Sequence, residues 1–393
     1  MRKMFISFFL CSLFNVIVSA QAYLNTILER LEYIQSASYI DLKEAWEPGD
    51  TEPVYATPFY MEEYRNPSDT VIGSSYLSWD SVGKRRFEGG YDGTVSASMF
   101  HEEKGIVIDD FSIPRAPFRL VSPPFFNYAE SIIRYLLGTT DSLTREIKET
   151  EEIYYVKMTI HEENQIEFFG KPCRIPTPPF YMEPTSIYEL WVDKLTGLPY
   201  KVRREMSHSI STNTVSEVKL NGLDPAAFNL YDCFPTDYEI RMYGQKKRST
   251  SALEGKKAPD WQLADTTGRL VSLSGLRGKI ILLNLTGIGC GPCHAAIPFL
   301  NTLKGRFPND LDVVAIDTWG RKQSSIRNYI RHNAIRYLFL EGTPNIAKAY
   351  QTGGAAPYFF LLDENRVVRK MFFGYKVGES DKEIIRVIEA LLR

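Results

Sequence analysis

The stretch KIILLNLTGIGCGPCHAAIP, residues 279–298, decides the fold of the C-terminal part of this chain. Its first half, Lys279–Leu285, is a continuous apolar run, as expected of a strand that is buried on both faces. Its second half carries two cysteines, Cys290 and Cys293, around a Gly-Pro pair, and Pro292 suits the first turn of a helix. The stretch therefore predicts a buried strand, a short loop and a helix that begins at the cysteines.

This setting suits a dithiol that makes and breaks a disulfide. A cysteine attacks disulfides only as the thiolate, so a reactive cysteine needs a pKa below its usual ~8.5. A helix N-terminus supplies partial positive charge and free N–H groups that favour the thiolate of Cys290. The two-residue spacer, Gly291 and Pro292, places Cys293 one turn later, close enough to attack a mixed disulfide at Cys290. We therefore expect Cys290 to be the nucleophile and Cys293 the resolving thiol.

Strands and helices alternate through residues 258–393. This alternation predicts an α/β domain with a parallel-containing sheet that is covered on both faces. The expected strands are residues 279–285, 311–317, 358–363 and 367–374, and the expected helices begin at Cys293, Ser324 and Asp381, the first with Ile297, Leu300 and Leu303 directed inward.

This domain resembles the thioredoxin-like superfamily, in particular the exported TlpA/ResA-type thiol–disulfide oxidoreductases. The resembling segments are the entry segment APDWQLADTTGRLVSLSGLRGKIILLNL, the CGPC motif and the loop GGAAPYFFLLD. Pro298 matches the proline that kinks the active-site helix of the family. Pro357 matches the family's cis-proline, which lies beside the dithiol and exposes the backbone of the preceding residue, here Ala356, to the substrate.

The resemblance implies an enzyme that exchanges disulfides with protein or peptide substrates and is recharged by an electron-donor thiol protein. Gly-Pro between the cysteines favours a reductase by this resemblance alone. No cofactor is implied. Two positions depart from the family pattern: Gly289 stands where Trp often precedes the first cysteine, and Asn284 stands where many thioredoxins have a buried acid. Asn284 cannot accept a proton from Cys293, so the activation of that thiol stays open.

Three other chemistries use similar cysteine motifs. Cys-x-x-Cys-His at residues 290–294 is also the attachment signature of c-type haem, with His332 or Met371 as a second axial ligand. The alternating buried strands and the Ala-Ala-Pro loop argue against haem. A zinc site needs a second Cys/His pair at ligand spacing, which is lacking. A peroxiredoxin needs P-x-x-x-T-x-x-C, but the segment that ends at Cys290 reads LNLTGIGC.

The upstream part, residues 21–243, begins with an amphipathic helix and continues as short strands. Clear strand candidates are residues 90–99, 153–160, 188–192 and the segment from Tyr200, and residues 128–138 read as a second helix. We expect an α+β domain with a curved antiparallel sheet, or half-barrel. It resembles the lipoprotein-carrier (LolA-like) class, on pieces such as LWVDKLTGLPYKVRRE and AAFNLYDCFP.

That second resemblance keeps a different function open. In the carrier class a curved sheet encloses an apolar cavity, and the 23 Tyr and 23 Phe of this chain could line one. The competing interpretation is that these aromatics form an ordinary sheet core. The alternative to an enzyme is therefore a binding protein for an apolar ligand or partner with a subordinate redox domain.

The remaining features of the sequence indicate how the two domains are joined and where the protein is located. Residues 244–257, polar and basic, read as a linker. Residues 1–20, with Arg2 and Lys3 before an apolar run, read as a signal peptide that directs the chain to the periplasm or another exported location. Cys11 would leave with the signal, and whether Cys173 and Cys233 pair is open. The net charge of −2 excludes nucleic acid as an expected partner, and no integral membrane segment is expected after signal removal.

Overall fold

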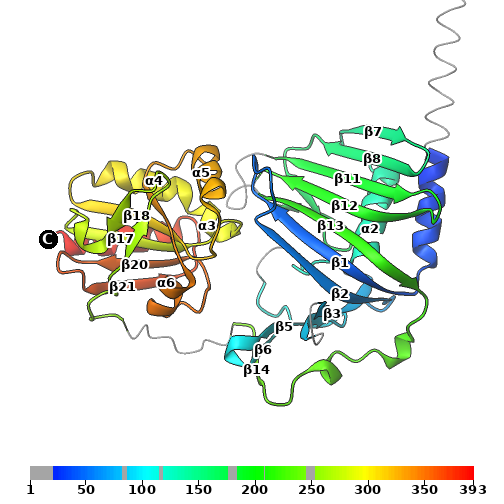
Figure 1. Cartoon of the computed structure of the whole chain (residues 1–393), viewed down its shortest axis with the longest axis horizontal. Helices are drawn as coiled ribbons and strands as arrows, with labels where there is room; N and C mark the ends of the chain where they lie inside the picture. Colours follow the sequence, from blue (N-terminus) through cyan, green and yellow to red (C-terminus); the bar gives the residue numbers. More distant parts are fainter. Residues whose placement is uncertain (1–20, 82–85, 115–117, 176–183, 208, 245–252) are drawn as a thin grey trace, which may run out of the picture.

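The computed structural model describes residues 21–81, 86–114, 118–175, 184–207, 209–244 and 253–393. It contains a large curved sheet in the N-terminal part and a separate α/β domain at the C-terminus (Figure 1). The predicted signal peptide at residues 1–20 lies outside the described residues. None of the described helices is long and apolar enough to cross a membrane.

The N-terminal sheet has 12 strands in the order β14-β6-β5-β4-β3-β2-β1-β13-β12-β11-β8-β7. A second pair, β9 with β10, lies apart from this ladder. The strands are β1 Ser36–Trp46, β2 Tyr55–Arg65, β3 Ser74–Asp80, β4 Phe87–Tyr91, β5 Ser96–Phe100, β6 Gly105–Asp109, β7 Leu143–Glu149, β8 Ile153–Ile160, β9 Gln165–Phe168, β10 Pro172–Ile175, β11 Ser186–Asp193, β12 Leu198–Met206, β13 Ser209–Leu220 and β14 Glu239–Met242.

One face of this sheet is closed by two helices. They are residues 21–33 and α2 (Phe125–Gly138), which share one apolar cluster with the inward side chains of the strands. In β8 every second residue is buried, from Tyr154 to Ile160, because successive strand residues point to opposite faces. The expected helix and half-barrel of the upstream part are thus confirmed. Short 3-10 helices are η1 His101–Glu103, η2 Pro225–Ala227 and η3 Tyr231–Cys233.

Two details differ from the sequence-based expectation. The sheet is mixed rather than wholly antiparallel, because β14 returns to the far edge and pairs parallel with β6. Residues 90–99 contain no single strand. They form the end of β4 and most of β5, joined by a turn in which Asp92 accepts hydrogen bonds from the backbone N–H groups of Thr94 and Val95. Asp-Gly at the tip is a strong turn signal, which the strand interpretation passed over.

The C-terminal domain has a five-stranded sheet in the order β19-β18-β17-β20-β21. β17, β18 and β19 run parallel, whereas β20 and β21 are antiparallel to their neighbours. Its elements are β15 Gln262–Ala264, β16 Leu270–Ser272, η4 Leu273–Gly275, β17 Ile280–Thr286, α3 Gly291–Ala295, α4 Ile297–Arg306, β18 Leu311–Asp317, α5 Gln323–His332, β19 Leu338–Glu341, α6 Pro344–Ala349, β20 Tyr358–Leu362, β21 Val368–Phe373 and α7 Glu379–Leu391.

Both faces of this sheet are covered, as the sequence predicts. One apolar cluster joins the even-numbered side chains Ile280 and Leu282 to helices α4, α5 and α7. The other joins Leu283 and Leu285 to α6 and to the segment that enters the domain. All seven residues of β17 are buried, which is the physical meaning of its uninterrupted apolar run. This double burial makes β17 a rigid base for the loop that follows it.

The segment that leads into this domain already packs against it at residues 253–257. Leu253 is buried in its core, and Lys257 forms an isolated bridge with Val367.

The two remaining described cysteines, Cys173 and Cys233, are both free thiols, the first buried and the second half-buried. The structural bridge between them that the sequence left open is therefore not formed.

Candidate redox site

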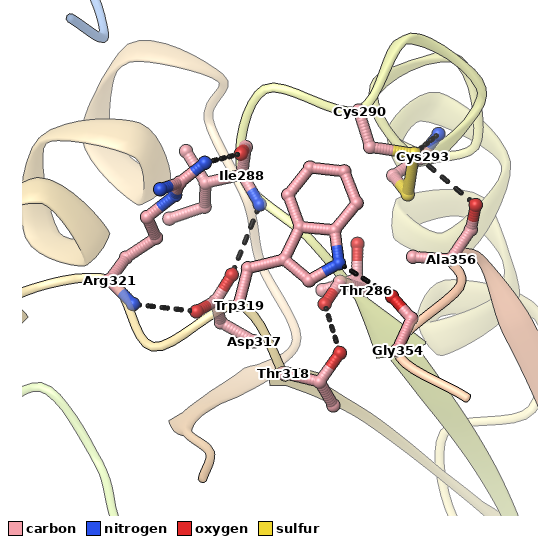
Figure 2. Close-up of a disulfide and its surroundings, with 10 residues drawn as sticks. All are labelled: Thr286, Ile288, Cys290, Cys293, Asp317, Thr318, Trp319, Arg321, Gly354 and Ala356. Atoms are coloured by element: carbon pink, nitrogen blue, oxygen red, sulfur yellow. Dashed lines mark hydrogen bonds between the residues drawn. A yellow bond between two sulfur atoms is a disulfide. The ribbon is translucent and has the colours of Figure 1, made fainter. Parts of the chain in front are cut away.

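The two cysteines of the CGPC motif form a disulfide at the junction of β17 and α3 (Figure 2). Their Cα atoms are 5.2 Å apart. Cys290 occupies the N-cap position of α3, and the backbone N–H of Cys293 donates a hydrogen bond to its Sγ over 3.2 Å. The same N–H would stabilise a thiolate at Cys290 after reduction. Cys290 is 8% exposed and Cys293 2%, so the first sulfur is the more accessible.

The strand-to-helix turn needs its glycines. Gly289 has a φ of +91°, which side-chain-bearing residues rarely adopt. After the turn, α3 is brief, and α4 begins at Ile297 with Pro298 in its first turn. Proline is tolerated there, since the missing N–H would lack an intrahelical partner. The predicted break of the active-site helix at Pro298 is confirmed, and Ile297, Leu300 and Leu303 are buried as expected.

The loop before β20 lies against the disulfide. The Ala356–Pro357 peptide bond is cis, as predicted from the family resemblance. The carbonyl oxygen of Ala356 lies 3.7 Å from the Sγ of Cys290. Ala356 is partly exposed and Pro357 is buried, so the backbone of Ala356 is presented beside the reactive sulfur.

Asn284 lies in the middle of β17 and is buried. It is on the same face of the strand as Leu282, the face covered by α4. Its Oδ1 atom has no hydrogen-bond partner among the residues that the structure describes. Asn284 thus keeps a polar atom beneath the active-site helix, at the position where many thioredoxins have an acid.

His294 follows the dithiol on α3. It is half-buried, and its ring centroid lies 6.3 Å from that of Tyr329 on α5. Burial, together with the nearby His332, lowers the pKa of His294 to about 4. At neutral pH its ring is uncharged, so it supplies no positive charge to a thiolate.

The end of β18 contributes residues that sequence reasoning missed. Asp317 is buried, and its carboxylate accepts hydrogen bonds from the backbone N–H of Ile288 at 3.1 Å and of Arg321 at 3.0 Å. Arg321 in turn donates to the carbonyl of Ile288 over 3.2 Å. These bonds hold the loop that leads to Cys290. The sequence offered one signal for Asp317 and Arg321, namely their position at the end of a buried strand. Because β17 and β18 are parallel, their carboxyl ends meet at one edge of the sheet.

Trp319 lies across the same loop (Figure 2). Its indole occupies the space where a Cβ on Gly287 would be, and its Nε1–H donates to the carbonyl of Gly354 over 2.9 Å. It joins the loop of the dithiol to the loop of Ala356 and remains 39% exposed. In sequence, this chain departs from the family at Gly289, where Trp often precedes the first cysteine. A tryptophan is present beside the dithiol, but it comes from the β18–α5 connection.

Replacing Trp319 with alanine is expected to impair the use of protein substrates. The variant loses the indole surface beside Cys290 and the hydrogen bond to Gly354, so the two loops are no longer joined. We expect kcat/KM for insulin reduction to fall about 5- to 10-fold, as for loss of a partly buried aromatic contact. The rate at which dithiothreitol reduces the Cys290–Cys293 disulfide should change less than about twofold.

A matched control is Leu270→Ala, which removes another exposed apolar side chain of the same domain. That variant should reduce insulin as the wild type does. Equal insulin kinetics for the Trp319 and Leu270 variants would show that the indole contributes nothing to substrate use.

Comparisons with known proteins concern this C-terminal part. Residues 254–371 match the model of the AhpC/TSA family. The thiol-disulfide oxidoreductase ResA of Bacillus cereus is 25% identical over 158 residues, which cover 40% of this chain and 82% of that protein. ResA of Bacillus subtilis is 28% identical over 121 residues, 30% of this chain and 67% of that protein.

Solved structures align with the same part of the chain. A thiol:disulfide interchange protein DsbE from Chlorobium tepidum is 24% identical, with a TM-score of 0.31, and the match covers 36% of this chain and 98% of that one. A protein disulfide isomerase from Bacteroides thetaiotaomicron is 25% identical, with a TM-score of 0.33, over 36% of this chain and 91% of that one. Residues 254–371 form a thioredoxin-like domain of the AhpC/TSA family, and this part of the chain is homologous to ResA-type thiol–disulfide oxidoreductases.

Proposed function

We propose that this chain is an exported thiol–disulfide oxidoreductase whose Cys290–Cys293 pair reduces disulfides in proteins or peptides. The observation that carries this proposal is the Cys290–Cys293 disulfide at the strand-to-helix junction, with the backbone of Ala356 beside it. Relatives named thiol-disulfide oxidoreductase support the redox chemistry. A signal peptide at residues 1–20, read from the sequence, supports export.

The proposed reaction moves two electrons in two exchange steps. The Cys290 thiolate attacks one sulfur of the substrate disulfide, so a mixed disulfide forms and a substrate thiolate leaves. Cys293, as a thiolate, then attacks Cys290 Sγ, which forms the Cys290–Cys293 disulfide and releases the second substrate thiolate. The substrate is reduced to a dithiol and takes up two protons. A donor dithiol returns the pair to its reduced form by the same exchange in reverse.

Ala356, Pro357 and Trp319 bound the space in which the substrate strand would lie. The backbone of Ala356 can hydrogen-bond an extended peptide next to Cys290, as in the binding of a peptide strand to an exposed edge. Asn284, Gly291, Pro292 and Pro298 support the pair from the strand and the helix below it. These roles fit a substrate that presents its disulfide on an extended, accessible segment.

The test is dithiothreitol-driven reduction of insulin by the full chain, combined with the reduction potential of the pair in a glutathione buffer. A reductase should accelerate insulin reduction and have a potential near the ~−270 mV of thioredoxin. A potential near ~−120 mV would reverse the proposed direction and leave the exchange chemistry in place. Absence of any exchange with either thiol would refute the proposal itself.

A second candidate function rests on a cavity in the N-terminal part. A space of about 450 Å³ lies under α2, within the size range of small-molecule sites. Its lining combines the apolar or aromatic side chains of Met61, Tyr76, Phe125, Tyr128 and Phe168 with the charged side chains of Asp41, Lys43, Glu44, Glu167 and Arg204. This favours a carrier role for a ligand that has an apolar body and a polar end. Binding of one equivalent of a naphthalene sulfonate dye, displaced by a fatty acid, would support that role, and a chain that binds neither would exclude it.

A further inference from the structure

A glutamate of the N-terminal part lies against the redox loop. Glu47 follows the last residue of β1 and is 3% exposed, which is unusual for an acid in a connecting segment. A Cβ placed on Gly289 would lie 3.5 Å from Glu47 Oε1 and 4.0 Å from Arg321 Nη2. The residue before Cys290 is therefore flanked by the carboxyl of one domain and the guanidinium of the other.

Arg321 joins the same two segments. One of its nitrogens donates to the carbonyl of Ile288, in the redox loop, and another lies 3.5 Å from the carbonyl of Val54, in the segment that carries Glu47. Its Nε is buried without a hydrogen-bond partner among the described residues. The guanidinium thus lies between the Glu47 segment and the loop, on the side where Asp317 anchors Ile288.

Further contacts hold residues 47–54 in place. Glu47 and Asp50 form a tight turn, in which each backbone N–H is bonded to the other residue. Asn328 of α5 donates to the carbonyl of Gly49 and to Asp50, at 3.2 and 2.9 Å. At the rim, Glu52 pairs with Lys322 at 2.7 Å, but both side chains are exposed, so this pair adds little to the hold on the segment. The segment is therefore fixed along the β18–α5 connection.

The N-terminal part also approaches the other active-site loop. A Cβ on Gly353, three residues before Ala356, would lie 3.3 Å from Oε1 of Glu103 in η1. Glu47 thus lies beside the loop that leads to Cys290, and Glu103 lies beside the loop that leads to Ala356. Both acids belong to the N-terminal part, so two parts of the chain meet around the redox site.

We propose that Glu47 is a positioning residue of the redox site, through which the N-terminal part fixes the loop of Cys290 and adjusts the reactivity of the dithiol. This inference rests on the proposed function. It also explains why residue 289 is glycine. A large side chain there, such as the tryptophan frequent in the family, would meet Glu47 and require a strained backbone.

The charges around Glu47 give the proposal a pH signature. It is faced by Asp50 of its own turn, by Asp317 at the end of β18, by Arg321, and by Tyr329 of α5. Burial first, and then Asp50, raise the pKa of Glu47 to about 8, against the opposing effect of Arg321. Glu47 is therefore mostly neutral at pH 7 and becomes an anion next to Gly289, the residue before Cys290, as the pH rises through about 8. An anion there opposes a second negative charge on Cys290.

The experiment compares Glu47→Ala, Glu47→Gln and Glu52→Gln in the full chain. Alanine removes the contact with the loop, so kcat/KM for insulin at pH 7 should fall about tenfold, whereas glutamine keeps the size of the neutral acid and should stay within about twofold. The equilibrium constant for reduction by dithiothreitol should be equal in wild type and Glu47→Gln at pH 6.5. At pH 9 it should be about three- to tenfold higher in Glu47→Gln, which cannot become an anion.

Glu52→Gln is the control, since its carboxylate belongs to the same segment but pairs with Lys322 in solvent. It should match the wild type at both pH values. The inference is overturned if Glu47→Ala reduces insulin like Glu52→Gln, or if the Glu47→Gln equilibrium follows the wild type from pH 6.5 to 9. A wild-type chain that exchanges no disulfide at all would instead defeat the proposed function.

Discussion

Cys293→Ser is expected to accumulate a mixed disulfide between Cys290 and the substrate, and Cys290→Ser is expected to accumulate almost none. Without Cys293 no second thiolate can attack Cys290 Sγ, so the first exchange product persists. Without Cys290 the buried Cys293 is the remaining thiol of the pair, and turnover should fall at least about 1,000-fold. Non-reducing gels and mass spectrometry of trapped adducts measure both outcomes, and the adduct also identifies the substrate.

The free cysteines provide the controls for this experiment. Both variants should be made in a Cys173→Ser/Cys233→Ser background, since those residues carry free thiols that could form adducts of their own. In the reduced protein, iodoacetamide should label Cys290 before Cys293, because Cys290 is more exposed and its sulfur accepts the N–H of Cys293. Faster labelling of Cys293 would reverse the assigned roles.

Glu167→Ala is expected to destabilise the N-terminal part by about 3–5 kcal/mol, the usual cost of leaving one member of a buried ion pair alone. Its side chain is 6% exposed and pairs with Arg204 of β12. The carboxylate also accepts hydrogen bonds from Tyr128 of α2 at 2.8 Å and Tyr188 of β11 at 3.2 Å. Alanine would leave a cation and two hydroxyls without this acceptor. Urea unfolding, followed by circular dichroism, gives the change in free energy.

Two comparisons make that measurement specific. Glu146→Ala removes a carboxylate from an exposed pair with Lys148 on the same sheet and should change the free energy of unfolding far less than Glu167→Ala does. The double variant Glu167→Met/Arg204→Met removes both charges and should recover much of the loss, because no unpaired charge is left in the buried site. If Glu167→Ala is no less stable than Glu146→Ala, the buried pair does not hold α2 to the sheet.

The sequence was sufficient for the redox domain because its elements are encoded locally. The apolar run at 279–285 indicates a strand that is buried on both faces, and the observed strand β17 (Ile280–Thr286) nearly coincides with this run. Pro292 and Pro298 place helix starts through the geometry of their own rings, and both lie in first turns. Cys290 and Cys293 are brought together by three residues of chain, so their pairing needs no distant partner.

Features built from distant segments were not predictable in the same way. β14 could have paired with several strand edges, and its parallel place beside β6 depends on the path of residues 221–238. His294 lies on α3, but Tyr329 of α5 packs near its ring, and partial burial together with His332 lowers its pKa to about 4. Burial of a side chain depends on which element packs over it, and a single helix does not specify that element.

The sequence alone thus determined the α/β domain, its CGPC pair, the cis bond at Pro357 and a curved sheet upstream. Tertiary structure alone decided that Trp319 borders the dithiol and that Cys173 and Cys233 stay apart. It also placed Glu47, more than 240 residues before Cys290, against the loop of that cysteine. The physical reason is that local patterns fix which face of an element is apolar. Which polar groups meet across two folded surfaces depends on the shape and charge of both surfaces together.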